Sequence, residues 1–280
     1  MTAARRWIGQ RGVLIFALLV LLYMFTPIFV VVLMSFNDPV GRLGYDFDGF
    51  TLNNWTTVCD PYQLCDSVAN SIKIGLLATG LATLLGALMA FAMVRHHFRG
   101  RSFSNVMIFL PMASPEIVLG SSLLALFVNA GFAGQLGFWT IFIAHVMFCL
   151  SFVVITVKAR LAGLDPNLEQ AAADLYANEW QTFWKVTFPL VLPGIVSAAL
   201  LSFSLSFDDF IITNLNAGQT VTFPMYVWGA AQRGIPMQVN VIGTIMFLIA
   251  LTLVAGNGLT GRLLRRPAPA AEVLSPVSKP

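Results

Sequence analysis

The sequence predicts an all-α membrane protein with six transmembrane helices and both termini in the cytoplasm. Of its 280 residues, 57% are hydrophobic and only 10% are charged, which is not the composition of a soluble globular domain. A helix needs about 20 apolar residues to cross a bilayer. Apolar runs of about this length lie at residues 13–36, 68–94, 104–128, 136–157, 190–215 and 239–260.

The basic residues predict the orientation of these helices. Arg42 and Arg233 fall on one side of the predicted membrane, and Lys73 lies inside a span near its outer end. The remaining 13 of the 16 basic residues fall on the other side, which the positive-inside rule assigns to the cytoplasm. The net charge of +3 reflects this asymmetry and does not indicate a nucleic-acid-binding surface. The cytoplasmic set is Arg5, Arg6, Arg11, Arg95, Arg99, Arg101, Lys158, Arg160, Lys185, Arg262, Arg265, Arg266 and Lys279.

We expect a single transmembrane domain over residues 1–266, with a long cytoplasmic loop at 158–190. The Pro- and Ala-rich segment at 267–280 is expected to be a disordered cytoplasmic tail. No cleavable signal is expected, because the first apolar run is too long for a signal-peptide core.

The three cysteines fall into two groups. Cys149 lies in an apolar run and is expected to be a small buried residue. Cys59 and Cys65 lie in the outer loop, on the oxidising side of the membrane, where a disulfide persists. Their spacing leaves a disulfide and two free thiols equally open, because spacing does not show whether the geometry suits a bond.

The third apolar run contains two prolines followed directly by a carboxylate. Pro111 and Pro115 are expected to break the helical ladder, and irregular backbone at membrane depth is tolerated only inside protein or beside a water-filled cavity. Glu116 falls roughly 18 Å into the span at about 1.5 Å per residue. An ionisable residue at that depth indicates a functional site. The alternative is a structural carboxylate that caps the helix restarting after Pro115.

The fifth span carries a stripe of polar residues that ends in two adjacent carboxylates. Ser204 and Asp208 share one helical face, and Ser206 and Asp209 share the next. The two aspartates lie roughly 22–27 Å from the cytoplasmic end of the span, toward the outer part of the bilayer. We expect Asp208 to face a solute pathway and Asp209 to be structural. In the fourth span, His145 is expected to form hydrogen bonds, with a proton relay as the alternative.

The polar stretch from Leu164 to Pro193 separates the fourth and fifth spans and is expected to form two short helices. Asp165 is the expected cap of the first helix, Pro166 suits its first position, and Glu169 lies near its positive end. One narrow face of that helix is apolar, with Leu168, Ala171, Ala172 and Leu175 at helical spacing.

The second short helix begins with Asn178 and Gln181, which have the spacing of a capping box. Short helices with exposed apolar faces between membrane spans are expected to dock a partner. An ordinary loop packed on its own protein is the alternative. The bulky face of the second helix comprises Trp180, Phe183, Trp184 and Phe188.

Motifs for hydrolytic chemistry do not occur in the sequence. There is no Gly-x-x-x-x-Gly-Lys-[Ser/Thr] phosphate loop, no His-Glu-x-x-His and no Gly-x-Ser-x-Gly. We therefore expect a pore subunit without catalytic residues, cofactor or metal, whose energy comes from a docked partner.

The loop resembles the cytoplasmic coupling loop of ATP-binding-cassette importer permeases, which carries a Glu-Ala-Ala motif. Ala171 and Ala172 match this motif, Gln170 takes its Glu position, and Tyr176 takes the position of a following Gly. The closing Ile-x-Leu-Pro positions are taken by Val186, Phe188 and Pro189.

Two departures from the motif have expected consequences. Glu169 is expected to supply the missing carboxylate one position early, as a polar anchor for the ATPase. If the turn needs a positive φ, Tyr176 costs roughly 1–3 kcal/mol there, and Asn178 is the residue expected to take the turn over. The resemblance implies an ATPase-contacting set of Glu169, Gln170, Ala171, Ala172, Asp174 and Tyr176.

Three further segments are similar to permeases of spermidine/putrescine importers: Leu-Gly-Phe-Trp at 136–139, Ala-His-x-x-Phe-Cys at 144–149 and Ser-Phe-Asp-Asp at 206–209. The resemblance implies a type I importer permease fold in the bacterial plasma membrane. It also implies a heterodimer with a second permease, an ATPase dimer, an extracytoplasmic binding protein and a polyamine substrate. The expected pathway residues are Asp208, Asp209, Glu116 and Ser204.

Other functions are consistent with the same residues. One is an importer of another solute, such as ferric ion, an opine or an oligopeptide. Another is a proton-coupled secondary carrier that uses Asp208, Asp209 and Glu116 as a relay. Within the polyamine class, putrescine and spermidine both stay open.

Overall fold

The helices of the protein fall into two units, which are described here one at a time. The computed structural model describes residues 2–41, 46–165 and 167–264, with side chains from 11 to 252. One unit is formed by residues 1–58 with 236–280, and the other by residues 59–235. Within the described ranges the chain is helical, apart from loops and an isolated β-bridge between Asn37 and Phe50. The expected tail at 267–280 lies outside the described residues.

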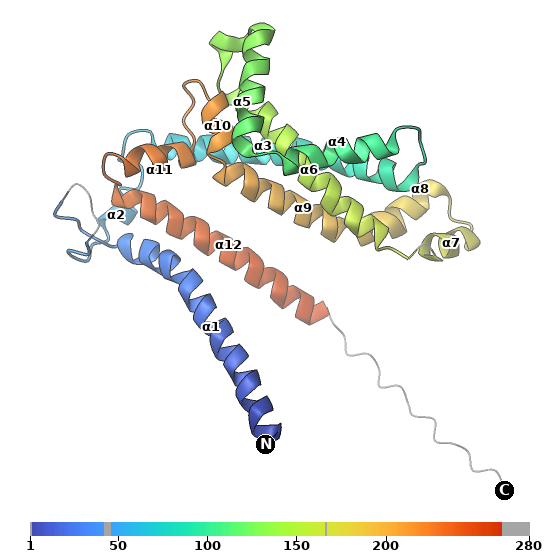
Figure 1. Cartoon of the computed structure of the whole chain (residues 1–280), viewed down its shortest axis with the longest axis horizontal. Helices are drawn as coiled ribbons and strands as arrows, with labels where there is room; N and C mark the ends of the chain where they lie inside the picture. Colours follow the sequence, from blue (N-terminus) through green and yellow to red (C-terminus); the bar gives the residue numbers. More distant parts are fainter. Residues whose placement is uncertain (1, 42–45, 166, 265–280) are drawn as a thin grey trace. The chain divides into compact units, whose positions relative to one another are not determined.

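The first unit pairs the two ends of the chain. Helix α1 (Thr2–Met34) runs antiparallel to α12 (Met237–Leu264), since Phe25 meets Phe247 and Val31 packs near Gly243 (Figure 1). The apolar side chains of α1 between residues 11 and 34 are largely exposed, which suits a helix surrounded by lipid or by another subunit.

The outer loop of this unit is held by buried amides. The Asn37 side chain donates to Asp46 O at 2.7 Å and accepts from Asp48 N at 2.9 Å. Asn54, in the short helix α2 (Asn53–Thr56), donates to Asn37 O at 2.7 Å. These bonds connect residues 46–48 and helix α2 to Asn37, and they satisfy the buried amide groups.

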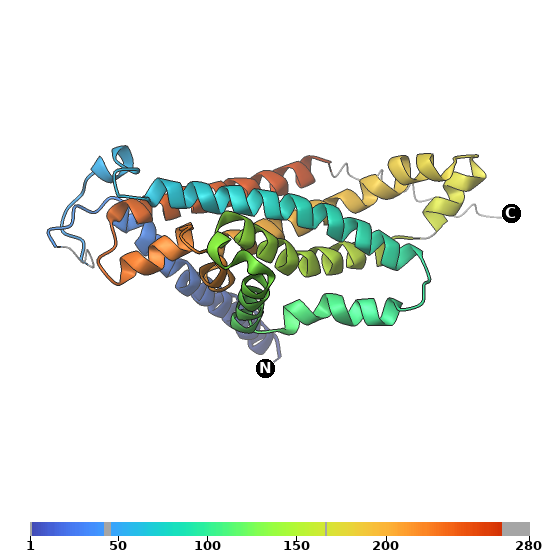
Figure 2. The ribbon, with the colours of Figure 1, turned by 90° about the horizontal axis from the view of Figure 1, so that it is seen from above.

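The second unit is built on three long helices that lie side by side, α3 (Leu64–Arg95), α6 (Phe138–Ala162) and α9 (Phe188–Asp208) (Figures 1 and 2). Small residues on α3 allow the close approach: Gly86 lies against Val153, and Gly75 lies against Phe203. Fully buried alanines lie on α3 at Ala78, Ala82 and Ala90, and on α6 at Ala144.

The remaining elements of this unit connect or cover the three long helices. They are α4 (Arg101–Ala113), α5 (Glu116–Phe127), η1 (Val128–Phe132), η2 (Ala133–Gln135), α7 (Asn167–Asp174), α8 (Glu179–Thr182), η3 (Phe183–Thr187), α10 (Ile211–Asn216) and α11 (Phe223–Ala231).

The third apolar run, predicted as one span at 104–128, is divided between two helices. Helix α4 ends at Ala113, Ser114 and Pro115 are extended with ψ values of 138° and 136°, and α5 then leaves in a new direction (Figure 1). The residue before a proline avoids the α conformation, which explains the position of the break. Pro111 stays inside α4, so its expected part in the break is wrong.

Five described helices are long and apolar enough to cross a bilayer, and a shorter sixth is at Met237–Thr252. The sixfold pattern predicted from the sequence is therefore confirmed in number, although the third candidate is Glu116–Gln135 rather than residues 104–128. The fifth also ends earlier than predicted, at Asp208.

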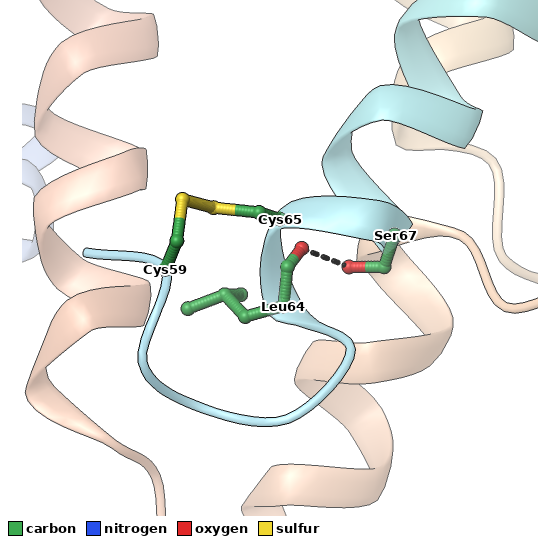
Figure 3. The surroundings of a disulfide bond; sticks show 4 residues. All are labelled: Cys59, Leu64, Cys65 and Ser67. Carbon is green, nitrogen blue, oxygen red and sulfur yellow. Dashed lines mark hydrogen bonds between the residues drawn. A yellow bond between two sulfur atoms is a disulfide. The ribbon is translucent and has the colours of Figure 1, made fainter. Parts of the chain in front are cut away.

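The loop that leads into α3 is closed by a disulfide between Cys59 and Cys65, whose Cα atoms are 5.3 Å apart (Figure 3). Leu64 is fully buried beside it, and Ser67 donates to Leu64 O at 2.7 Å. Cys149 is a buried free thiol on α6, as expected.

We predict that the unreduced protein in intact cells resists a membrane-impermeant thiol reagent. Reductant should then release two reactive thiols, while Cys149 stays unlabelled because it is buried. The measurement is the labelled mass of the chain with and without reductant. Ready labelling at Cys59 or Cys65 before reduction would contradict the bond.

Candidate functional site

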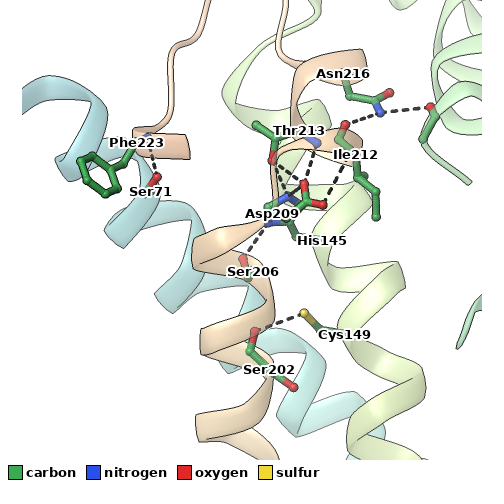
Figure 4. A network of polar contacts seen from close by, with 11 residues as sticks. Ser71, His145, Cys149, Ser202, Ser206, Asp209, Ile212, Thr213, Asn216 and Phe223 are labelled. Carbon is green, nitrogen blue, oxygen red and sulfur yellow. Dashed lines mark hydrogen bonds and ion pairs between the residues drawn. The ribbon is translucent and has the colours of Figure 1, made fainter. Parts of the chain in front are cut away.

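The two adjacent aspartates lie where α9 stops and α10 begins. Asp208 is the last residue of α9, and Asp209 is extended with ψ 124°. The Asp209 carboxylate then caps α10, accepting from Thr213 N at 2.7 Å, Thr213 Oγ1 at 2.8 Å and Ile212 N at 3.4 Å (Figure 4). The Asp209 side chain is 2% exposed, so these bonds replace the hydrogen bonds to water that the carboxylate loses on burial.

His145 of α6 contacts the interruption between α9 and α10 at Asp209, which we call the break. Its Nδ1 lies 2.6 Å from Ser206 Oγ, and its Nε2 lies 2.8 Å from Thr213 Oγ1 and 3.3 Å from Asp209 Oδ2 (Figure 4). Because the Thr213 hydroxyl donates to Asp209, its oxygen is left to accept, so Nε2 carries a proton. The hydrogen-bonding role expected for His145 is confirmed.

The two polar faces of α9 have different surroundings. Ser206 and Asp209 are buried against α6 and α10, whereas Ser204 and Asp208 are exposed. The helical spacing therefore separates two polar faces. Ser206 and Asp209 face inward and form hydrogen bonds within the chain, whereas Ser204 and Asp208 face outward, where another molecule can reach them.

The third sequence-predicted carboxylate is brought to the same place. Glu116 is exposed at the start of α5, and the charges of Asp208 and Asp209 act on it. Helix α5 reaches this position because Gly120 packs on Ile212, and Asn216 Nδ2 donates to Gly120 O at 3.2 Å. Asn216 belongs to α10, so the helix that Asp209 caps also positions α5.

Aromatic rings flank the break. Phe207 lies between Phe203 and Phe223, with ring centroids 5.9 and 6.1 Å away. Phe210 lies 5.3 Å from Trp228, which is 59% exposed. Among the described residues, no three His, Cys, Asp or Glu side chains group as metal ligands.

The polar loop forms a second candidate surface, with the two short helices predicted for it. Asp165 Oδ1 accepts from Asn167 N at 2.9 Å at the start of α7, while Pro166 lies outside the described residues. Ala172 is the only buried residue of α7. The residues facing solvent include Gln170, Ala171, Asp174, Leu175 and Tyr176.

The turn after α7 uses Tyr176 in a left-handed conformation, with φ 61°. Ala177 N donates to Ala172 O at 3.0 Å and Tyr176 N donates to Ala173 O at 2.9 Å, which is the hydrogen-bond pattern of a Schellman motif. The expectation that Asn178 takes over this turn is wrong, because Asn178 is extended and caps α8. Its capping box with Gln181 is confirmed, with bonds of 2.8 and 3.1 Å.

Glu169, which is expected to anchor an ATPase, forms bonds within its own chain. Its carboxylate binds both terminal nitrogens of Arg95, at the end of α3, and accepts from Thr187 Oγ1 at 2.5 Å. Arg95 and Thr187 together hold the pKa of the Glu169 carboxyl below its usual range, so it is charged at neutral pH. Hydrogen-bond donors within the same chain thus already occupy the Glu169 carboxylate.

Sequence reasoning missed Arg95, Thr187 and Thr213 as parts of these sites. The sequence indicates Arg95 only as one of the basic residues of the cytoplasmic edge, because its partner is 74 positions away in the chain. Thr213 carried a weak local signal, since it follows Asp209 at the spacing of a capped helix start.

The fold and the loop define a class of protein. Residues 82–270 match the family model described as "Binding-protein-dependent transport system inner membrane component". The chain belongs to this family, and it is a multi-pass inner-membrane transport subunit.

Three individual proteins are similar to most of this chain. The chain is 35% identical over 241 residues to "Spermidine/putrescine transport system permease protein PotC" of Escherichia coli strain K12, covering 86% of this chain and 90% of the relative. It is 37% identical over 248 residues to the Haemophilus influenzae protein of the same name, covering 88% and 95%. It is 32% identical over 230 residues to "Putrescine transport system permease protein PotI" of Escherichia coli strain K12, covering 80% and 81%.

Solved structures show the same fold. One is described as "Crystal structure of bacterial alginate ABC transporter in complex with alginate pentasaccharide-bound periplasmic protein", with a TM-score of 0.68 and 15% identity over 94% of this chain and 96% of that one. Another is an inward-facing MetNI methionine ABC transporter, with a TM-score of 0.58 and 15% identity over 73% and 97%.

We predict that His145→Ala destabilises the protein by about 3 kcal/mol, because it leaves the buried Asp209 carboxylate without the imidazole. The check is the midpoint of thermal unfolding in detergent. The exposed His96 gives the matched control, and His96→Ala should change stability by about 0.5 kcal/mol or less. Equal effects of the two alanine variants would show that the network adds nothing.

Proposed function

We propose that this chain is the polyamine-translocating permease of an ATP-driven importer. In this proposal it pairs with a second permease, receives spermidine or putrescine from an extracytoplasmic binding protein, and docks an ATPase dimer on its cytoplasmic loop. The names of the relatives support the substrate class. The family description names a binding-protein-dependent system, which speaks against the proton-coupled carrier.

The observation that carries the proposal is the difference in burial between Asp208 and Asp209. Asp209 is buried and saturated with hydrogen bonds, whereas Asp208 is exposed one residue away, on the same face as Ser204. An ammonium group moved into a low-dielectric region costs several kcal/mol unless a counter-charge meets it. Asp208 and Glu116 are free of ion pairs within the described part of the chain, so both can supply that charge.

A second feature suits a linear polyamine. Its ammonium groups are separated by methylene segments, which need apolar surface between the charges. The Phe210 and Trp228 rings offer such a surface near the carboxylates, and an aromatic face also attracts cations. We include these rings in the proposed pathway as secondary contacts.

We predict that Asp208→Asn lowers polyamine import at least tenfold while the complex still assembles. The amide keeps the size and hydrogen bonding of the side chain and removes only its charge, and about 1.4 kcal/mol corresponds to one factor of ten. The measurement is uptake of labelled putrescine and spermidine, normalised to assembled complex.

Asp209→Asn is the matched comparison, because it makes the same change one residue further along. Its effect should fall on assembly and stability, since the amide cannot accept all of the bonds that cap α10. Import at the parental rate by both asparagine variants would remove the carboxylates from the substrate pathway.

The proposed ATPase-docking surface is the exposed face of α7 and the turn that follows it. Ala171 presents a small side chain that lets a partner approach closely, and Leu175 and Tyr176 project beyond it, 81% and 97% exposed. Gln170 and Asp174 flank this surface with polar groups. A contiguous group of exposed apolar side chains outside the membrane is typical of a site that contacts a partner.

We predict that Ala171→Trp abolishes coupling by steric exclusion. Import should fall to background and the ATPase should no longer co-purify, while the thermal unfolding of the permease stays unchanged because Ala171 is exposed. Ala171→Ser, which adds one atom, is the control and should behave as the parent. Normal ATPase retention by the tryptophan variant would place the docking surface elsewhere.

A further inference from the structure

One carboxylate joins three segments at the cytoplasmic end of the second unit. Glu169 comes from the first turn of α7, Arg95 is the last residue of α3, and Thr187 is the last residue of η3, directly before α9. We define Arg95, Glu169 and Thr187 as the junction. Both charged partners are partly exposed, and Thr187 is buried.

Helix α7 has few other attachments to the membrane helices. It is eight residues long, and Ala172 is its only buried residue. Behind it lies a cavity of about 700 Å³, lined in part by Phe91 and Phe183, where packed side chains would otherwise fix its position. With so little packing, the orientation of α7 depends on the bonds that Glu169 makes.

The other two members of the junction lie on helices that reach the candidate pathway. Helix α9 begins after Thr187 and ends at Asp208. Helix α3 packs along α9 over its length, with Gly75 against Phe203 near the far end. Glu169 is therefore bonded to the cytoplasmic ends of both α3 and α9 at once.

We propose that the junction is the link through which a movement of α7 reaches α3 and α9, and that Glu169 is a positioning residue rather than a contact for the ATPase. This inference rests on the proposed docking of an ATPase on α7. A bidentate arginine–carboxylate pair suits the role, because two parallel bonds fix an orientation as well as a distance. Such an exposed pair adds little to folding stability, so the junction can be broken without unfolding the protein.

A charge swap separates the two roles of Glu169. Glu169→Arg and Arg95→Glu each place like charges at the junction, and each should lower transport per ATP hydrolysed about fivefold or more, the lower range of coupling between sites. The double variant restores an ion pair in the reverse sense and should return transport per ATP to within about twofold of the parent.

A direct ATPase contact predicts a different result. If Glu169 met a basic group of the ATPase, the double variant would stay as defective as Glu169→Arg, because the partner would still face an arginine. That outcome overturns the inference, as does normal coupling in both single variants. Glu179→Arg is the matched control, since Glu179 lines the same cavity without an ion pair among the described residues, and it should couple normally.

Two further readouts separate this inference from the proposed function. Co-purification of an ATPase with the parent chain tests the docking itself. A double-mutant cycle on thermal unfolding of the permease alone tests the junction without any partner. Each single charge reversal introduces like-charge repulsion, so the charge-swapped double variant should be more stable than the sum of the two single effects predicts. Additive effects in that cycle would overturn the junction even if the ATPase binds.

Discussion

The interruption of the fifth span depends on one buried interaction, the contact of Asp209 with His145 and Thr213. A helix cannot stop at membrane depth without partners for its free backbone groups, because no water is present to satisfy them. The Asp209 carboxylate supplies those partners for α10, and His145 fixes the carboxylate from α6. Asp208 is exposed because its neighbour is held inside. A polar network within the protein thus determines which carboxylate another molecule can reach.

The polar loop between α6 and α9 shows how a strained residue is retained. A left-handed conformation costs a residue other than glycine about 1–2 kcal/mol, yet Tyr176 adopts it in a complete Schellman motif. The bonds of that motif and the capping box of α8 offset the cost within the same few residues. The turn consequently presents a nearly fully exposed tyrosine, where a glycine would present no side chain. The tyrosine in place of the family glycine therefore changes the exposed surface of the turn and keeps its left-handed backbone conformation.

The features that the sequence predicted are the local ones. Apolar runs predicted the spans, Asn178 and Gln181 predicted a capping box through their spacing, and the alternating faces of α9 separated Asp208 from Asp209. The missed features depend on distant segments. Nothing near Arg95 indicates Glu169, because the two meet only when the loop folds back on α3. The direction of α5 was also missed, since Pro115 predicts a break in the helix but not where the next helix points, which depends on Asn216 and Gly120.

The two sites use their charges in different ways, and the surroundings explain why. At the junction the Glu169–Arg95 pair is partly in contact with solvent, so breaking it costs little free energy. This suits the movement of α7 that we propose. At the break, the Asp209 and His145 side chains are almost wholly buried. Removing either one leaves the polar group of the other buried without this hydrogen-bond partner. Disrupting the break is therefore expected to cost more folding free energy than disrupting the junction. Helix α9 leads from Thr187 at the junction to Asp208 at the break, with α3 packed beside it. In the mechanism that we propose, a displacement at the junction therefore tilts these helices about a nearly stationary Asp208, and it moves the walls of the proposed pathway past the Asp208 carboxylate.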